Sequence, residues 1–261
     1  MALIRIDSQN HQVSTIVSTL LNVIQQTQTS QDKSVDWSIM NCDSLLLALL
    51  KIYKCFATKE INAPSIDTFE DLIEFGVSDN STNIIISQVE NSLFHKDVRI
   101  KPLKVAISYM LDELICNIQQ HAQVSTGYIF ADYNKSTDSI DICLADCGVT
   151  IYGSYVQSGK YLDVIGNSDA EALNIAKDGY STKNRPDAEN RGYGISSNVK
   201  MITEGLDGTF AILSGNALMI NLNGTMQVAS LPEDIEWQGT CVVIRIPIDP
   251  DRTFNLYDYI S

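Results

Sequence analysis

The sequence predicts an α+β protein, a two-layer sandwich with helices on one face of a mixed sheet, preceded by a small α/β module. Segments with a helical period dominate the first half of the chain, and apolar, strand-like runs separated by turn residues dominate the second half. A length of 261 residues is enough for one or two domains with a substantial core. We expect an N-terminal module over residues 1–98 and a second domain over residues 99–261.

The N-terminal module is predicted to consist of helices and one short strand. Residues 13–28 place apolar side chains at a helical period, and residues 34–39 are predicted to form a strand. Residues 43–56 form a strongly apolar second helix, with Asp43 as its N-cap. A third short helix is expected around residues 67–76. The polar stretch that follows places the boundary between the two parts of the chain somewhere between about residues 77 and 100.

The second domain begins with a longer helix, whose first turn suits Pro102 and which runs to about Ala122. Two strands rich in β-branched and aromatic residues follow, at 126–134 and 139–146. Helices are then expected at 169–179 and 195–206. The remaining strands are TFAILS, ALMINLN, MQVAS and TCVVIRIPI, spaced by glycine or asparagine turns.

The charge balance restricts the partners. The chain has 18 basic and 32 acidic residues, a formal net charge of −14, which disfavours nucleic acid and an anionic membrane surface. No signal-like or membrane-spanning pattern is present, since the strongest apolar run, Leu45–Leu50, stops at Lys51. Six cysteines without a C-x-x-C pair are typical of free thiols in a reducing compartment, so we expect a cytoplasmic protein.

The longer helix carries a polar row beside its apolar stripe. Glu113, Asn117 and His121 follow one another at i, i+4 and i+8 and therefore share one edge of the helix. A carboxylate at such an edge can act as a general base, and an amide oxygen suits Mg²⁺. A solvated helix edge is the alternative interpretation of these three residues.

Three later segments add candidate ligand contacts. Asp146 ends an apolar strand, where its carboxylate can accept a hydrogen bond from an exocyclic amine of a ligand. Gly148 permits the ligand to approach closely. The segment Arg191–Gly194 precedes a helix, where backbone N–H groups can meet phosphate. Thr240 begins the last strand and offers a hydroxyl group.

These segments together resemble the four motifs of the Bergerat-fold ATPases, which include DNA gyrase, large heat-shock chaperones, mismatch-repair ATPases, histidine kinases and anti-sigma-factor serine kinases. LDELICNIQQHA matches E-x-x-x-N-x-x-x-H, ADCGVT matches D-x-G-x-T, RGYG supplies the phosphate glycines, and QGTCVVIRIPI supplies the closing G-T. The motifs occur in order over about residues 100–248. The chain looks closest to the histidine-kinase-like and anti-sigma serine kinase branch, because it lacks the transducer that gyrase-type ATPases append.

The resemblance implies a site for ATP and Mg²⁺. Glu113 would position or deprotonate the attacking group, and Asn117 would coordinate Mg²⁺. The nucleotide contacts implied are Asp146 and Thr240 at the adenine, Gly148 in shaping the pocket, Gly192 and Gly194 at the phosphates, and Lys183 at the γ-phosphate. Residues 153–191 would form the ATP lid. A solvated loop lysine is the alternative interpretation of Lys183.

The resemblance leaves several functions open. The first is a regulatory kinase that transfers the γ-phosphate to a partner protein. The second is an ATP-sensing interaction module, in which nucleotide orders the lid without turnover. The third is a slow ATPase clamp, which would require a homodimer formed through residues 1–30.

The N-terminal module offers one further resemblance. VDWSIMNCDSLLLALLKIY is similar to the strand-to-helix segment of STAS domains, in which an Asp-Ser pair precedes the helix. Asp43 and Ser44 occupy that place, but Leu45 and Leu46 replace the expected serine and glycine. Helix initiation is the default interpretation of Ser44, and phosphorylation is the alternative.

Overall fold

The computed structural model describes residues 2–7, 11–29, 35–40, 42–57, 72–77, 82–182 and 193–259. The strands are β1 (Ala2–Asp7), β2 (Val35–Met40), β3 (Leu72–Gly76), β4 (Thr126–Asn134), β5 (Ser139–Ala145), β6 (Thr209–Gly215), β7 (Ala217–Leu222), β8 (Thr225–Ser230) and β9 (Trp237–Pro247). The α-helices are α1 (Val13–Thr29), α2 (Ser44–Ala57), α3 (Thr82–Leu93), α4 (Lys104–Asn117), α5 (Ile151–Ser158), α6 (Leu162–Ile165), α7 (Asp169–Lys177) and α8 (Tyr193–Lys200). Shorter helical turns are η1 (Val98–Leu103), η2 (Ile118–Ala122), η3 (Met201–Gly205) and η4 (Leu256–Asp258).

Seven described strands form one open sheet in the order β3-β4-β5-β9-β6-β7-β8, and each neighbouring pair is antiparallel. β1 and β2 form a separate parallel pair. The α+β class is therefore confirmed, but the prediction of a mixed sheet is wrong for the seven-stranded sheet. Short turns join β4 to β5 and link β6, β7 and β8, and connections of this length produce antiparallel neighbours.

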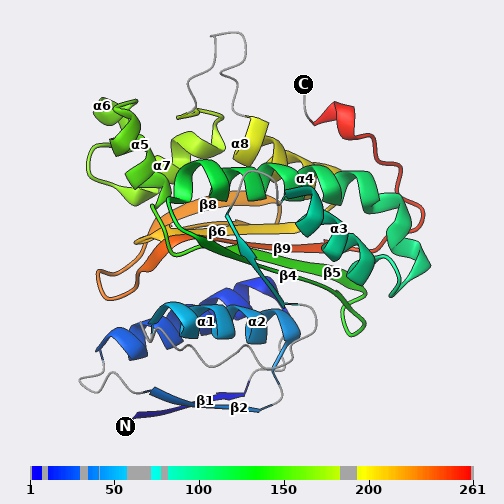
Figure 1. Ribbon diagram of the computed structural model, residues 1–261, viewed down its shortest axis with the longest axis horizontal. Coiled ribbons are helices and arrows are strands. Elements are labelled where there is room, and N and C mark those ends of the chain that lie inside the picture. The colour runs from blue at the N-terminus through cyan, green and yellow to red at the C-terminus, as the bar shows by residue number, and fades with distance from the viewer. Residues whose placement is uncertain are drawn as a thin grey trace.

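Helices cover both faces of the sheet (Figure 1). Ile142 and Leu144 of β5 belong to the core shared with α3 and α4, whereas Cys143 and Ala145 belong to the core shared with α1 and α2. The prediction of helices on one face only is therefore wrong. The physical reason is visible in the continuous apolar runs of β5 and β9, which are typical of strands buried on both sides.

The segment before residue 98 is joined to the main sheet. β3 pairs with β4, with Leu72 opposite Phe130 and Gly76 opposite Thr126. α3 packs in the same core as α4 through Ile85 and Val89. The predicted boundary between residues 98 and 99 falls at the start of η1, and it does not separate two cores among the described residues.

Two elements near this boundary differ from the prediction. Residues 72–76 form β3 and not the end of a helix, because pairing with β4 decides the conformation of a short apolar segment; residues 67–71 lie outside the described residues. α3 was not predicted. Its buried residues Ile85, Val89 and Leu93 nevertheless follow a helical i, i+4, i+8 spacing, which is a signal that the sequence contains.

Most of the other elements agree with the prediction to within a few residues, but β1, α5 and α6 were not predicted. Asp43 caps α2, since its Oδ1 accepts a hydrogen bond from the N–H of Leu45 at 2.9 Å. The predicted longer helix runs from α4 into the π-helical turn η2 and ends at Ala122. All six cysteines are free, and no helix of the described part is long and apolar enough to cross a membrane.

Candidate functional site

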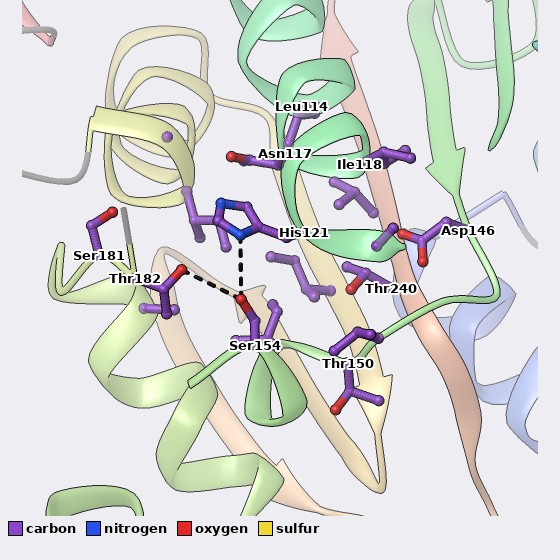
Figure 2. A pocket seen from close by; sticks show the side chains of 18 of the residues that line it. Leu114, Asn117, Ile118, His121, Asp146, Thr150, Ser154, Ser181, Thr182 and Thr240 are labelled. Carbon is purple, nitrogen blue, oxygen red and sulfur yellow. Dashed lines mark hydrogen bonds between the residues drawn. The ribbon is translucent and has the colours of Figure 1, made fainter. Parts of the chain in front are cut away.

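A cavity of about 170 Å³ lies between the end of the sheet and the helices α4, α5, α7 and α8 (Figure 2). The described part of its wall is mostly apolar, and its polar groups come from four separate parts of the chain. The residues predicted for the site that line it are Glu113, Asn117, His121, Asp146, Gly194 and Thr240.

The polar row of the longer helix faces the beginning of α8. A Cβ atom placed on Gly194 would lie 3.2 Å from Nδ2 of Asn117 and 3.5 Å from Oε2 of Glu113. The glycine therefore allows the main chain at the start of α8 to approach both side chains. The chain changes from α-helix to π-helical turn directly after Asn117, and the turn carries His121 into the same cavity (Figure 2).

Asp146 occupies the opposite side of the cavity, where β5 ends beside β9. Its main-chain N–H donates to the carbonyl oxygen of Thr240 at 2.9 Å, which continues the pairing of the two strands by one residue. Its Oδ1 accepts a hydrogen bond from the N–H of Gly148 at 2.9 Å. The side chain of Asp146 also lines the cavity.

Burial controls the charge of this carboxyl group. Asp146 is 2% exposed, and desolvation raises its pKa from 3.8 to about 7. Hydrogen bonds with the backbone of Gly148 and Thr240 oppose the shift only in part. The carboxyl group therefore changes its protonation state near neutral pH, a property concentrated in functional sites.

Two glycines allow the strand ends to close around Asp146. A Cβ atom on Gly148 would overlap the main-chain oxygen of Ala122, which accepts the N–H of Val149 at 2.8 Å. Gly239 has a φ of +87°, and a Cβ atom there would overlap the main chain of Asp146. Gly148 does not line the cavity itself, so its role among the described contacts is to permit this close approach and to donate to the carboxylate.

Gly148→Ala is expected to destabilise the protein by at least about 2 kcal/mol, because the new methyl group displaces main-chain atoms that cannot turn aside. Equilibrium unfolding in urea measures the change. Gly76→Ala is the matched control, since a Cβ atom at Gly76 meets nothing within 4 Å. Equal stability losses in the two variants would contradict this account of Gly148.

The sequence did not single out two hydroxyl-bearing residues of the cavity wall, Ser154 and Tyr155, and it marked Thr150 only as the last residue of the D-x-G-x-T match. Thr150 caps α5, with its Oγ1 accepting the N–H of Gly153 at 3.0 Å. Oγ of Ser154 lies 3.3 Å from Nδ1 of His121 and 3.3 Å from Oγ1 of Thr182. α5 itself was not predicted, although the threonine and the apolar residues after it are the ordinary signals of a helix start.

The predicted lid segment contains three helices in its described part. α5, α6 and α7 share a small core that includes Tyr155, Ile165 and Ala172. Ser181 and Thr182, at the end of this part, line the cavity. Lys183 and Gly192 lie outside the described residues, so their predicted phosphate contacts stay predictions.

The cavity wall has an unusual charge balance for an anion site. Its described residues include the carboxylates Glu113 and Asp146 but no lysine or arginine. The described residues also contain no group of three or more histidine, cysteine, aspartate or glutamate side chains arranged to hold a metal. An anionic ligand at these residues would therefore depend on main-chain N–H groups and on a cation that it brings with it.

No model of a protein family matches this chain, and no curated protein matches it. The class of protein supported here is defined by the fold and by the site: an α+β protein with a cavity at one end of an antiparallel sheet.

Proposed function

We propose that this chain binds ATP with Mg²⁺ in the cavity and is a regulatory protein of the histidine-kinase-like, Bergerat-fold type. The observation that carries the proposal is that residues from all four sequence motifs line the same cavity. Glu113, Asp146, Gly194 and Thr240 are widely separated in the sequence, yet all line one cavity, as the four sequence motifs require. The layer of helices α3, α4, α7 and α8 over an antiparallel sheet also supports the Bergerat sandwich, to which α1 and α2 add a further layer.

The base of the nucleotide is assigned to the side of Asp146. The carboxylate of Asp146 lines the cavity and can accept a hydrogen bond from an exocyclic amine, and Thr240, whose hydroxyl group is a further polar contact, lies on the neighbouring strand. Apolar residues complete this part of the wall, among them Leu144, Ile212 and Val242. A planar, largely apolar ring with one amine fits these surroundings.

The phosphates are assigned to the side of α8. The helix begins at Tyr193, and its first N–H groups and dipole favour negative charge. Asn117 and Glu113 face the same point across Gly194, and the amide oxygen of Asn117 is a hard ligand of the kind that Mg²⁺ prefers. Bound Mg²⁺ would neutralise phosphate charge that no described lysine or arginine of the wall can neutralise.

Glu113 is assigned the role of general base. The side chain is half-buried and lines the phosphate side of the cavity, where it can hold the hydroxyl group of an acceptor and take its proton. We infer that the acceptor is a hydroxyl group on a partner protein, and hydrolysis by water is the slower alternative.

A sensing function is the second candidate, and one contact favours it. Thr182, at the described end of the predicted lid, contacts Ser154, which in turn contacts His121 beside the proposed phosphate position. A ligand that displaces His121 changes the contacts of the lid without any chemical step. Such a change alters partner affinity by population shift alone.

Glu113→Gln is expected to retain ATP affinity within about threefold and to lose turnover by a factor of about 100 or more, because the amide cannot accept the proton. Asp112→Asn is the matched control: it removes an exposed carboxylate from the adjacent position of the same helix. Isothermal titration measures binding.

Incubation with labelled ATP, followed by mass spectrometry of the chain and of co-purifying proteins, measures turnover. Label on a partner hydroxyl supports the kinase, free phosphate alone supports the ATPase, and intact ATP with retained binding supports the sensor. Failure of the wild-type chain to bind ATP with Mg²⁺ would overturn the proposal as a whole.

A further inference from the structure

Trp237 connects the candidate base site to the helical layer on the other face of the sheet. The residue begins β9 and is 2% exposed. Its indole Nε1–H donates to the main-chain oxygen of Asp146 at 3.3 Å. A buried carbonyl group without a donor is costly, so this hydrogen bond helps to fix the main chain from which the carboxylate projects.

The other side of the indole ring packs against α2. The rings of Tyr53 and Phe56 lie with their centroids 6.0 and 5.5 Å from the indole centroid. Phe56 also contacts Tyr128 edge-on at 5.5 Å. These contacts restrict the indole on the side away from the cavity, since aromatic pairs at this separation have preferred geometries.

α1 holds the chain immediately before Trp237. Nε2 of Gln25 donates to Oδ2 of Asp234 at 2.9 Å, and Nε2 of Gln28 donates to the main-chain oxygen of Glu236 at 3.2 Å. Both helices of the second layer therefore contact the segment that leads into Trp237 and, three residues later, into Thr240.

We propose that Trp237 is a positioning residue for the base-binding side of the site, and that α2 sets the affinity for the base through it. The inference rests on the proposed function. It assigns a role in adenine recognition to the layer formed by α1 and α2, which does not touch the cavity in the described part of the chain. Because α8, Asn117 and Glu113 lie on the phosphate side, their contacts do not depend on Trp237.

The central experiment compares two ligands, Mg²⁺ with ATP and Mg²⁺ with inorganic triphosphate, by isothermal titration on the full chain. Trp237→Phe keeps an aromatic ring against α2 but removes the N–H donor. It is expected to weaken ATP binding about fivefold, the effect of one hydrogen bond, and to leave triphosphate binding within twofold of wild type. A general loss of structure would weaken both ligands alike.

A second pair of variants tests whether the packing of α2 on Trp237 affects the affinity for the base. Phe56→Leu loosens the packing on the indole without touching Asp146, and we expect a two- to fourfold loss for ATP alone. Phe254→Leu is the matched control, because Phe254 is also half-buried and stacks on Tyr259 at 5.6 Å, in a different core. It is expected to leave both affinities unchanged.

The outcomes separate the two proposals. If wild-type protein binds neither ATP nor triphosphate, the proposed function fails, and this inference fails with it. If wild-type protein binds ATP and Trp237→Phe binds it equally well, only the positioning role is overturned. Equal weakening of ATP and triphosphate in Trp237→Phe also overturns it, since the effect is then not confined to the base.

Discussion

Asp146→Asn is expected to weaken ATP binding about 10- to 100-fold. The oxygen that accepts the N–H of Gly148 must stay an oxygen, so the asparagine amide turns its NH₂ group toward the cavity. There it meets the exocyclic amine of the base, donor against donor, and the charge-assisted hydrogen bond is lost. Inorganic triphosphate, which has no base, is expected to bind the variant as it binds wild type.

The same substitution is expected to stabilise the ligand-free protein above neutral pH. The folded-state pKa of about 7 lies above the ordinary value of 3.8, so between these values the native state holds a proton that the unfolded chain has released. The free energy of unfolding therefore falls as the pH rises from about 4 to about 7. A shift of about three units corresponds to at most about 4 kcal/mol at pH 8.

Urea unfolding of wild type and Asp146→Asn at pH 5 and pH 8 measures this difference. The variant is expected to gain stability relative to wild type at pH 8 and to gain less at pH 5. Asp112→Asn, which removes an exposed carboxylate, is the matched control. A variant that is less stable than wild type at both values would contradict the burial argument for Asp146.

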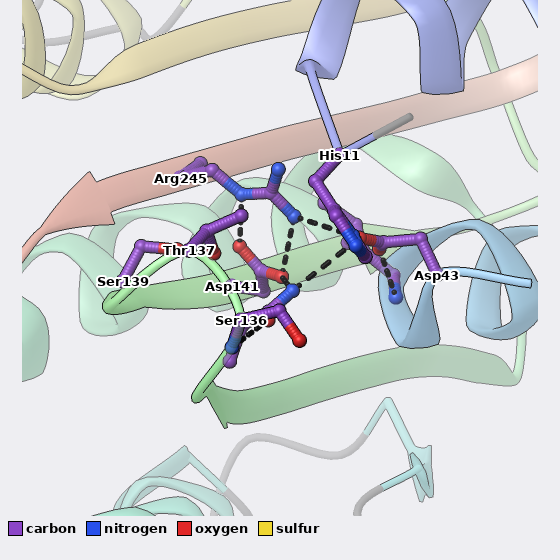
Figure 3. A network of polar contacts seen from close by, with 9 residues as sticks. His11, Asp43, Ser136, Thr137, Ser139, Asp141 and Arg245 are labelled. Carbon is purple, nitrogen blue, oxygen red and sulfur yellow. Dashed lines mark hydrogen bonds and ion pairs between the residues drawn. The ribbon is translucent and has the colours of Figure 1, made fainter. Parts of the chain in front are cut away.

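Arg245→Met is expected to destabilise the protein by about 3–5 kcal/mol at pH 7, the usual effect of leaving buried charges without a partner. Arg245 lies on β9 between two carboxylates whose side chains have no exposed area, Asp141 of β5 and Asp43 at the start of α2 (Figure 3). Nη2 of Arg245 donates to Asp141 Oδ2 at 2.6 Å and to Asp43 Oδ2 at 3.4 Å.

Arg245 opposes the effect of burial on the pKa of Asp141. Desolvation raises the pKa of Asp141, and the hydrogen bonds and charge of Arg245 lower it. Without the arginine, protonation relieves the buried carboxylate of Asp141, whose pKa burial raises, so the stability loss of Arg245→Met is expected to shrink at pH 5. Arg245→Met combined with Asp141→Asn is expected to recover part of the loss at pH 7.

Arg99→Met is the matched control. Arg99 also contacts two aspartates, Asp97 at 2.8 Å and Asp138 at 2.7 Å, but its side chain is 37% exposed. Exposed ion pairs contribute at most about 1 kcal/mol, so the loss is expected to be small. Similar losses for Arg99→Met and Arg245→Met in urea unfolding would contradict the role assigned to burial.

The sequence predicted most elements of the second domain because their signals are local. The helix that carries Glu113 and Asn117 has an unbroken apolar stripe, and the strand that ends at Asp146 has a β-branched, apolar run. Turn residues separate the strands after them. That residues of separate segments share one site was implied by the resemblance to the four motifs and not by spacing within a segment, and the structure brings Glu113, Asp146 and Thr240 to one cavity.

What the sequence did not predict depends on contacts between distant segments. The conformation of residues 72–76 depends on pairing with β4, and the second layer of helices depends on which face of each strand is covered. The hydrogen bond from Trp237 to Asp146 and the ion pair of Arg245 with Asp43 join residues 91 and 202 positions apart. No local pattern carries such pairings.

The central place of β9 has a consequence for synthesis. Among the described strands of this sheet, β9 comes last in the sequence, yet it lies between β5 and β6. β5 and β6 do not pair with each other, so β9 is what joins the two halves of the sheet. A nascent chain that ends before residue 237 has Asp141 without its arginine and Asp146 without Thr240. The ribosome must therefore release β9 before the sheet can close, and a product truncated before residue 237 has neither a complete core nor a complete cavity wall.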